Sequence, residues 1–248
     1  MIYNSRGGGK NMEKKDKLTI HNIFWYFLIF SIIGIIIETI YCYITMGKLE
    51  SRKGLIWGPF CPVYGVSGAI LIMFLNKHSN KNIIYLFIYG FILGSIAEYL
   101  LSFGLESIYG IRFWDYGYVN LHLNGRICLQ FSIYWGLLSI IIMRFVKPGI
   151  DKVINKIPVK PRNIAEIILI IFFSINCIFT VWGIQTYQNR VVYNKINNIE
   201  TNNVFIQIKQ KIENDYFTNE RMSKTFPNLR IKDAQGNEIW VRTLINQE

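Results

Sequence analysis

Residues 34–41 read Gly-Ile-Ile-Ile-Glu-Thr-Ile-Tyr, and residues 94–101 read Gly-Ser-Ile-Ala-Glu-Tyr-Leu-Leu. In both stretches a glutamate follows a glycine by four positions. Each stretch lies inside an apolar run that is long enough to cross a bilayer. A carboxylate in hydrocarbon costs about 2.5–3.5 kcal/mol on insertion scales unless it faces protein, water or a partner. Glu38 and Glu98 are therefore the first candidates for a functional site.

The composition is that of a membrane protein. The chain is 51% hydrophobic and 17% charged, whereas an ordinary soluble domain has about a quarter charged residues. A spanning helix needs about 20 mostly apolar residues. Five segments meet this need: 23–45, 56–75, 83–103, 127–147 and 164–184. The second begins irregularly because Pro59 and Pro62 interrupt it. The sequence predicts an all-α integral membrane protein of about five transmembrane helices.

We divide the chain into three parts. Residues 1–22 form a basic N-terminus, in which Met1 and Met12 are alternative starts, and this end lacks the features of a cleaved signal peptide. Residues 23–184 form the transmembrane domain. Residues 185–248 form a polar C-terminal tail, with an amphipathic helix within 186–216, lying on the membrane or on a partner, and a β-hairpin within 228–244 around Gly236.

The net charge of +11 indicates a lipid partner, not nucleic acid, because the basic residues gather in short segments beside the spans. If the N-terminus is inside, the segments on the cytoplasmic side carry more Lys and Arg than the segments on the outer side, as is usual for membrane proteins. We therefore expect a multi-pass protein of the cell membrane, with a cytoplasmic N-terminus and, after five spans, a C-terminus outside.

The first and third spans run in the same direction, so Glu38 and Glu98 are expected at similar depth. The fourth span begins on that side directly after Arg126, which we predict as a shared counter-charge for both carboxylates. The preceding loop is either an aromatic belt at the interface or a lid over the acidic site. Its candidate residues are Arg112, Trp114, Asp115 and Tyr116.

Glycines indicate close helix packing at Gly34, Gly90 and Gly94. The recurrence of Gly-x-x-x-Glu also suggests an internal duplication, in which two tandem helical hairpins are followed by one helix. Composition alone can produce such matches between apolar spans. The further matching pairs are Gly54 with Gly125, Phe60 with Phe131, Gly65 with Gly136, and Phe74 with Phe145.

No enzyme, cofactor or metal signature is legible. The stretch Gly7-Gly8-Gly9-Lys10 is no phosphate loop, because Asn11 replaces the required Ser or Thr. No Cys and His spacing indicates a metal, and we expect no catalytic residues. A Cys61–Cys128 disulfide is conceivable, but buried free cysteine is the default.

Several stretches together resemble one bacterial family, described as "Putative ABC-transporter type IV" and often labelled as ABC transporter permeases. They are Gly34 to Tyr41, Gly58-Pro-Phe-Cys-Pro-Val-Tyr-Gly65, Glu98-Tyr-Leu, Phe113-Trp-Asp-Tyr116, Leu123-Asn-Gly-Arg-Ile-Cys128 and Phe226-Pro-Asn-Leu-Arg-Ile. The resemblance implies a membrane permease subunit with a separate ATPase partner. The only sizeable cytoplasmic loop, 148–163, is expected to be too proline-broken to form a docking helix.

Three functions remain open. The first is a transporter or permease subunit whose polar site is built from Glu38, Glu98 and Arg126, binding a cation or relaying protons. The second is a non-transporting scaffold or sensor that acts through its C-terminal tail. The third is an intramembrane enzyme with one glutamate as general base. Since five spans are few for a complete carrier, we also expect a homodimer.

Overall fold

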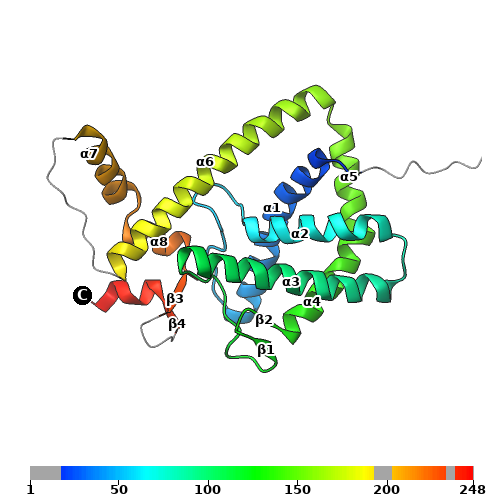
Figure 1. The fold of residues 1–248 in the computed structure, drawn as a ribbon, viewed down its shortest axis with the longest axis horizontal. Helices are drawn as coiled ribbons and strands as arrows, with labels where there is room; N and C mark the ends of the chain where they lie inside the picture. The colour runs from blue at the N-terminus through cyan, green and yellow to red at the C-terminus, as the bar shows by residue number, and fades with distance from the viewer. Residues whose placement is uncertain (1–17, 193–202, 233–237, 248) are drawn as a thin grey trace, which may run out of the picture.

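The computed structural model describes residues 18–192, 203–232 and 238–247, and its architecture is almost entirely helical (Figure 1). Four helices are long and apolar enough to cross a membrane: α1 (Ile20–Met46), α3 (Ile83–Tyr109), the continuous helix Leu129–Lys156, and α6 (Val159–Val191). The all-α membrane class expected from the sequence is confirmed. The long helices extend the predicted spans, because helix continues past the apolar residues to the first capping signal.

The caps of α1 and α3 show how the sequence sets these bounds. Thr19 and Asn82 precede the two helices, and their side chains accept hydrogen bonds from the amides of Asn22 and Tyr85. Both helices end at a glycine in the left-handed region, Gly47 or Gly110, where glycine has no Cβ penalty. Repeated cap chemistry therefore gives two helices of 27 residues each.

The second predicted span, 56–75, forms a shorter helix. Helix α2 (Pro62–Leu75) has 14 residues, which is about 21 Å of helix against a hydrocarbon core of about 30 Å. Pro62 lies in its first turn, where the missing amide hydrogen costs nothing. Residues 47–61 before it are irregular. A short 3₁₀-helix, Asn76–His78, follows it.

Helix α4 (Leu129–Ile141) passes through a π-helical turn (Ile142–Val146) into α5 (Lys147–Lys156). Residues 148–163 are more helical than the prolines suggest, since helix covers Lys147–Lys156 and resumes at Val159, while the absence of a docking helix for a partner stays a prediction. Pro148 follows directly on the π-helical turn of this continuous helix, where the α-helical hydrogen-bond pattern is already interrupted, and Pro158 caps α6.

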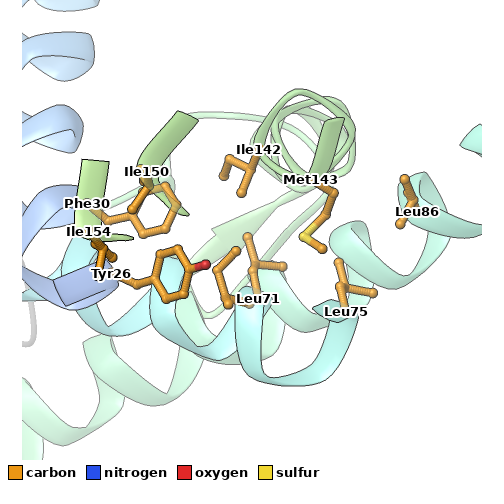
Figure 2. Packing of buried hydrophobic residues seen from close by; sticks show 10 residues of the cluster. Tyr26, Phe30, Leu71, Leu75, Leu86, Ile142, Met143, Ile150 and Ile154 are labelled. Atoms are coloured by element: carbon orange, nitrogen blue, oxygen red, sulfur yellow. The ribbon is translucent and has the colours of Figure 1, made fainter. Parts of the chain in front are cut away.

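A buried apolar cluster joins one end of the bundle (Figure 2). It brings together side chains of α1, α2, α3, α5 and the π-helical turn. At its edge the Tyr26 hydroxyl donates a hydrogen bond to Asp151. The cluster consists of Tyr26, Phe30, Leu71, Ile72, Leu75, Leu86, Ile142, Met143, Ile150 and Ile154.

The described residues 203–232 and 238–247 of the tail form a small module, which we call the C-terminal module. It contains α7 (Val204–Lys211), a π-helical turn (Ile212–Tyr216) and α8 (Asn219–Thr225). Strands β3 (Arg230–Lys232) and β4 (Glu238–Trp240) pair antiparallel with Ile231 opposite Ile239, and a 3₁₀-helix (Val241–Gln247) follows. The described part of the predicted hairpin is confirmed, while its turn, 233–237, lies outside the described residues. Of the amphipathic helix predicted within 186–216, α6 takes in residues 186–191 and α7 covers Val204–Lys211, while residues 193–202 lie outside the described residues.

The C-terminal module packs on the bundle through a second buried cluster. Ile56, Ile111, Ile184 and Tyr187 supply the side chains from the bundle. The module supplies Phe217, Met222, Phe226, Leu229, Ile231 and Val241. The module is therefore a cap on one end of the bundle, beside the short hairpin of β1 (His122–Leu123) and β2 (Ile127–Cys128) (Figure 1).

The structure repeats the pairing expected from an internal duplication. In the α1–α2 hairpin, a Cβ on Gly65 would lie 2.7 Å from the ring of Phe27. In the α3–α4 hairpin, a Cβ on Gly136 would lie 2.7 Å from the ring of Phe87. Gly65 and Gly136 are a pair that the sequence comparison matched. Their equivalent contacts support two related hairpins in tandem, followed by α6.

The close packing leads to a test with a control in the same helix. A Cβ on Gly94 would lie 2.3 Å from Cγ of Trp135, whereas a Cβ on Gly104 meets nothing within 4 Å. We expect Gly94→Ala to lower the free energy of unfolding by about 1–3 kcal/mol through overpacking. Gly104→Ala should leave stability unchanged or raise it, since alanine favours helix. Thermal unfolding of the purified protein in detergent measures both; equal shifts would contradict this packing.

Candidate functional site

Glu38 lies on α1 and is held by an aromatic residue of α2. The Tyr64 hydroxyl donates a hydrogen bond of 2.7 Å to its carboxylate. The Tyr64 ring lies across Gly34, one helical turn earlier, where a Cβ would be 2.2 Å from the ring. Gly34 therefore makes room for the ring, and the ring carries its hydroxyl to the glutamate.

Glu98 has the equivalent arrangement on α3. Trp135 of α4 lies across Gly94, and its indole nitrogen donates to the Glu98 carboxylate at 3.1 Å. Tyr116, from the loop between α3 and α4, donates a second hydrogen bond of 2.7 Å. Glu98 is only 7% exposed. Each hairpin thus holds its glutamate with a ring that rests on the preceding glycine.

Aromatic rings connect the two carboxylate sites. The Tyr116 ring stacks on Phe131 with 4.6 Å between centroids, and Phe131 meets Tyr41 of α1 edge to face at 6.0 Å. Burial, followed by Glu98 and more weakly by Glu38, raises the pKa of Tyr116 well above its usual range. The phenol therefore stays protonated and remains a donor. Of the two glutamates, Glu98 contacts this hydroxyl group directly.

Arg126 does not take the predicted place as a shared counter-charge. It pairs with Glu106 at 2.6 Å and donates to the Ser102 hydroxyl at 3.1 Å. In the parts of the chain that the structure describes, neither Glu38 nor Glu98 has an ion pair. Glu106 lies eight residues after Glu98, about 12 Å further along α3. The β1–β2 hairpin directs Arg126 to the C-terminal end of α3.

Arg112 and Asp115 lie in a network that fastens the C-terminal module to the bundle. Arg112 pairs with Glu106 at 2.5 Å and with Glu238 at 2.7 Å. Its backbone also exchanges two hydrogen bonds with Arg230, of 2.9 and 2.8 Å. We call this network the latch; it consists of Glu106, Arg112, Asp115, Arg126, Arg230, Lys232 and Glu238.

The latch is partly shielded from water. The Arg112 side chain is 6% exposed and the Glu238 side chain 14%. Burial, followed by the neighbouring Asp115 carboxylate, raises the pKa of Glu238 above its usual range, and Arg112 and Arg230 oppose this rise. Trp114, another predicted site residue, donates from its indole nitrogen to the Arg126 carbonyl at 3.0 Å. These contacts tie the loop, its hairpin and the C-terminal module together.

Sequence reasoning missed two features. Trp135 was not recognised as a donor to Glu98, although the matched spans align it with Tyr64. Glu166 of α6 is also buried, at 4% exposure, and accepts hydrogen bonds from the indole of Trp25 at 2.6 Å and pairs with His21 at 2.5 Å. It joins α6 to the start of α1. Glu166 lies near the start of the predicted span 164–184, and an acidic residue at the end of a span does not by itself indicate burial.

The structure also shows the contacts of Gly90 and the state of the cysteines. A Cβ on Gly90 would lie 2.0 Å from the Ser139 hydroxyl, so the helices α3 and α4 approach closely there. All four cysteines are free, and the conceivable Cys61–Cys128 bond is not formed. Among residues 18–192, 203–232 and 238–247, no group of three or more His, Cys, Asp or Glu could hold a metal.

Long apolar helices with buried carboxylates define a multi-pass helical membrane protein. Within that class, the family model described as "Putative ABC-transporter type IV" matches residues 25–181. The chain belongs to this family, as the resemblance in its sequence indicated. The match covers both hairpins and most of α6. No curated protein and no solved structure matches the chain.

The latch makes a prediction about the C-terminal module. Replacing Arg112 by Gln leaves Glu238 with weaker pairing, to Arg230 at 3.5 Å, and should weaken docking by roughly 3 kcal/mol. Limited proteolysis should then cut within residues 203–247 faster than in the unaltered protein.

Lys224→Gln is the matched control. Lys224 belongs to the same module, and its pair with Glu220 is exposed to solvent. Such pairs contribute little to stability, so proteolysis should not change. If both variants were cleaved alike, the latch would not be what holds the module.

Proposed function

We propose that the chain is the membrane-embedded component of a transporter, with Glu38 and Glu98 as its cation- or proton-binding groups. The observation that carries this proposal is that neither carboxylate has an ion pair among the described residues, although the buried Arg52 acts on Glu38 electrostatically. Each accepts hydrogen bonds from aromatic donors alone within the described residues: Tyr64 for Glu38, and Tyr116 with Trp135 for Glu98. Neutral donors orient a carboxylate without cancelling its charge.

This environment favours reversible binding. A carboxylate in an apolar helix is costly when ionised and unpaired, so capture of a proton or a cation relieves the cost. A fixed arginine partner would satisfy the charge permanently, and the ion pair of Arg126 with Glu106 leaves the two carboxylates without one. Parallel repeats that hold a site between the halves are a known transporter arrangement. We assign the pair a binding role and no catalytic one.

Membership of the family supports further parts of the proposal. We infer a separate ATPase as energy source, and a second copy of the chain to complete the translocation path. Several basic residues lie around the starts of α3 and α6 and the end of α5, among them Lys77, Lys81, Lys152, Lys156 and Lys160. Because membrane proteins carry an excess of Lys and Arg on the cytoplasmic side, we infer that this end lies inside and the C-terminal module outside the cell membrane.

A scaffold or sensor remains the second candidate, favoured by the latch. The module is fastened by Arg112 to the same loop that supplies Tyr116 to Glu98. Deleting residues 186–248 distinguishes the two functions: a carrier should keep some flux in proteoliposomes, whereas a scaffold should lose all of its effect.

The binding proposal predicts the loss of a titrating carboxyl group. Infrared difference spectra of the protein in lipid, recorded on changing pH or adding Na⁺, should show carboxyl bands. Glu98→Gln and Glu38→Gln should each remove one of them. Proton or Na⁺ uptake into proteoliposomes, with the ATPase supplied where required, should fall at least tenfold in either variant, the equivalent of about 1.4 kcal/mol.

Two controls accompany these variants. Expression level and thermal stability must match those of the unaltered protein, since equal loss of protein would make the glutamates folding residues. Glu220→Gln, which alters an exposed pair on α8, should leave the spectra and the uptake unchanged. Unaltered bands in both Glu38→Gln and Glu98→Gln would refute the proposal.

A further inference from the structure

Helix α7 presents an apolar stripe that no described part of the protein covers. Phe205 is 79% exposed, the highest fraction among the exposed large hydrophobic side chains. Val204 is 65% exposed and Ile208 is 54% exposed. With 3.6 residues per turn, Val204 and Ile208 lie one turn apart with Phe205 beside them. Helices α1, α3 and α6, which also expose apolar side chains, are long and apolar enough to cross a membrane, whereas α7 is short.

Two lysines border this stripe. At 100° per residue, Lys211 falls on one side of it and Lys209 on the other. Lysines in these positions can extend their charged ends away from an apolar surface while their stems lie along it. Among the described residues Lys209 has one long pair, at 3.7 Å to Glu213, and Lys211 has none. An apolar stripe between lysines is typical of a helix that lies in a membrane interface.

The π-helical turn that follows α7 (Ile212–Tyr216) is fixed to the end of the apolar part of α6. Glu213 is buried and accepts a hydrogen bond of 2.8 Å from the indole of Trp182. Arg190 donates to the Glu213 carbonyl at 2.8 Å. The apolar run of α6 ends near Ile184, so these contacts hold the helix at the level where hydrocarbon gives way to headgroups.

Aromatic side chains gather at the same level. The Trp57 indole donates to the Tyr216 hydroxyl at 2.6 Å, and Phe217 packs against Trp182 with 5.2 Å between centroids. Trp and Tyr are enriched at membrane interfaces. Figure 1 shows α7 lying away from the bundle of α1 to α5, so its free face is open to a surface outside the protein.

We propose that α7 lies in the headgroup region of the bilayer, with Val204, Phe205 and Ile208 inserted and with Lys209 and Lys211 on anionic phospholipid headgroups. The occupant is the lipid surface that already surrounds α6, and the lysines make the contact selective for negative charge. This inference does not depend on the transport site. Each lysine near an anionic surface should favour the inserted state about fivefold.

The full-length protein in vesicles tests this. Cys177 is replaced by Ser, because the other three cysteines are buried, and Phe205→Cys carries a polarity-sensitive fluorophore. Lys224→Cys carries the same label as control, on an exposed polar position of α8. Phospholipid with a spin label near the headgroup is the quencher. The vesicles are phosphatidylcholine, or equal parts of phosphatidylcholine and phosphatidylglycerol.

We expect the label at 205 to be quenched, and more strongly with phosphatidylglycerol, while the label at 224 is not. Lys209→Gln with Lys211→Gln should remove the dependence on phosphatidylglycerol. Equal weak quenching at both positions would overturn the proposal. So would shielding of the 205 label from aqueous iodide without lipid quenching, since a protein surface would then cover the helix.

A second measurement leaves Phe205 in place. Hydrogen–deuterium exchange of residues 203–211 in the unlabelled protein should slow when phosphatidylglycerol replaces half of the phosphatidylcholine. The double lysine variant should lose this slowing. Exchange that is the same in both lipids would refute the anionic contact even if the labelled variant folded poorly.

Discussion

The cost of holding a carboxylate among apolar helices shapes this protein. Both hairpins meet that cost in the same way: a glycine admits an aromatic ring from the next helix, and the ring brings a donor to the glutamate one turn later. Tyr64 does this for Glu38 and Trp135 for Glu98. The glycines are required because any side chain there would displace the ring. Helix packing and the polar site are therefore one feature, repeated in two related hairpins.

Among the described residues, the ion pairs of Arg126 and Arg112 lie outside these two sites. Arg126 meets Glu106 at the C-terminal end of α3, and Arg112 extends the same network to Glu238 of the C-terminal module. The buried Glu98 and the half-buried Glu38 accept hydrogen bonds from neutral donors. One loop serves both regions, since Tyr116 contacts Glu98 and Arg112 contacts the module. A change in module docking thus has a direct structural route to the Glu98 site.

Much of the fold could be predicted because apolar run length and cap chemistry are local. The ends of α1 and α3 follow from Thr19, Asn82, Gly47 and Gly110. Proline was harder to interpret, because its effect depends on the turn it occupies: Pro62 begins the short helix α2, whereas Pro148 lies beside the π-helical turn of a continuous helix. The partner of Arg126 could not be predicted, because the position of a residue along a span gives its approximate depth but not the acidic side chain that it contacts. Glu106 was visible in the sequence, but its proximity depends on the direction of the β1–β2 hairpin.

The sequence alone determined the membrane class, the helical hairpins, the two glycine–glutamate pairs and the family, since these depend on composition and spacing within single helices. Only the tertiary structure decided which aromatic ring reaches each glutamate, that no arginine does so within the described residues, and that the tail is a docked module with an uncovered α7. Those features depend on contacts between segments far apart in the chain. Their energies arise from burial and charge pairing that no single segment contains.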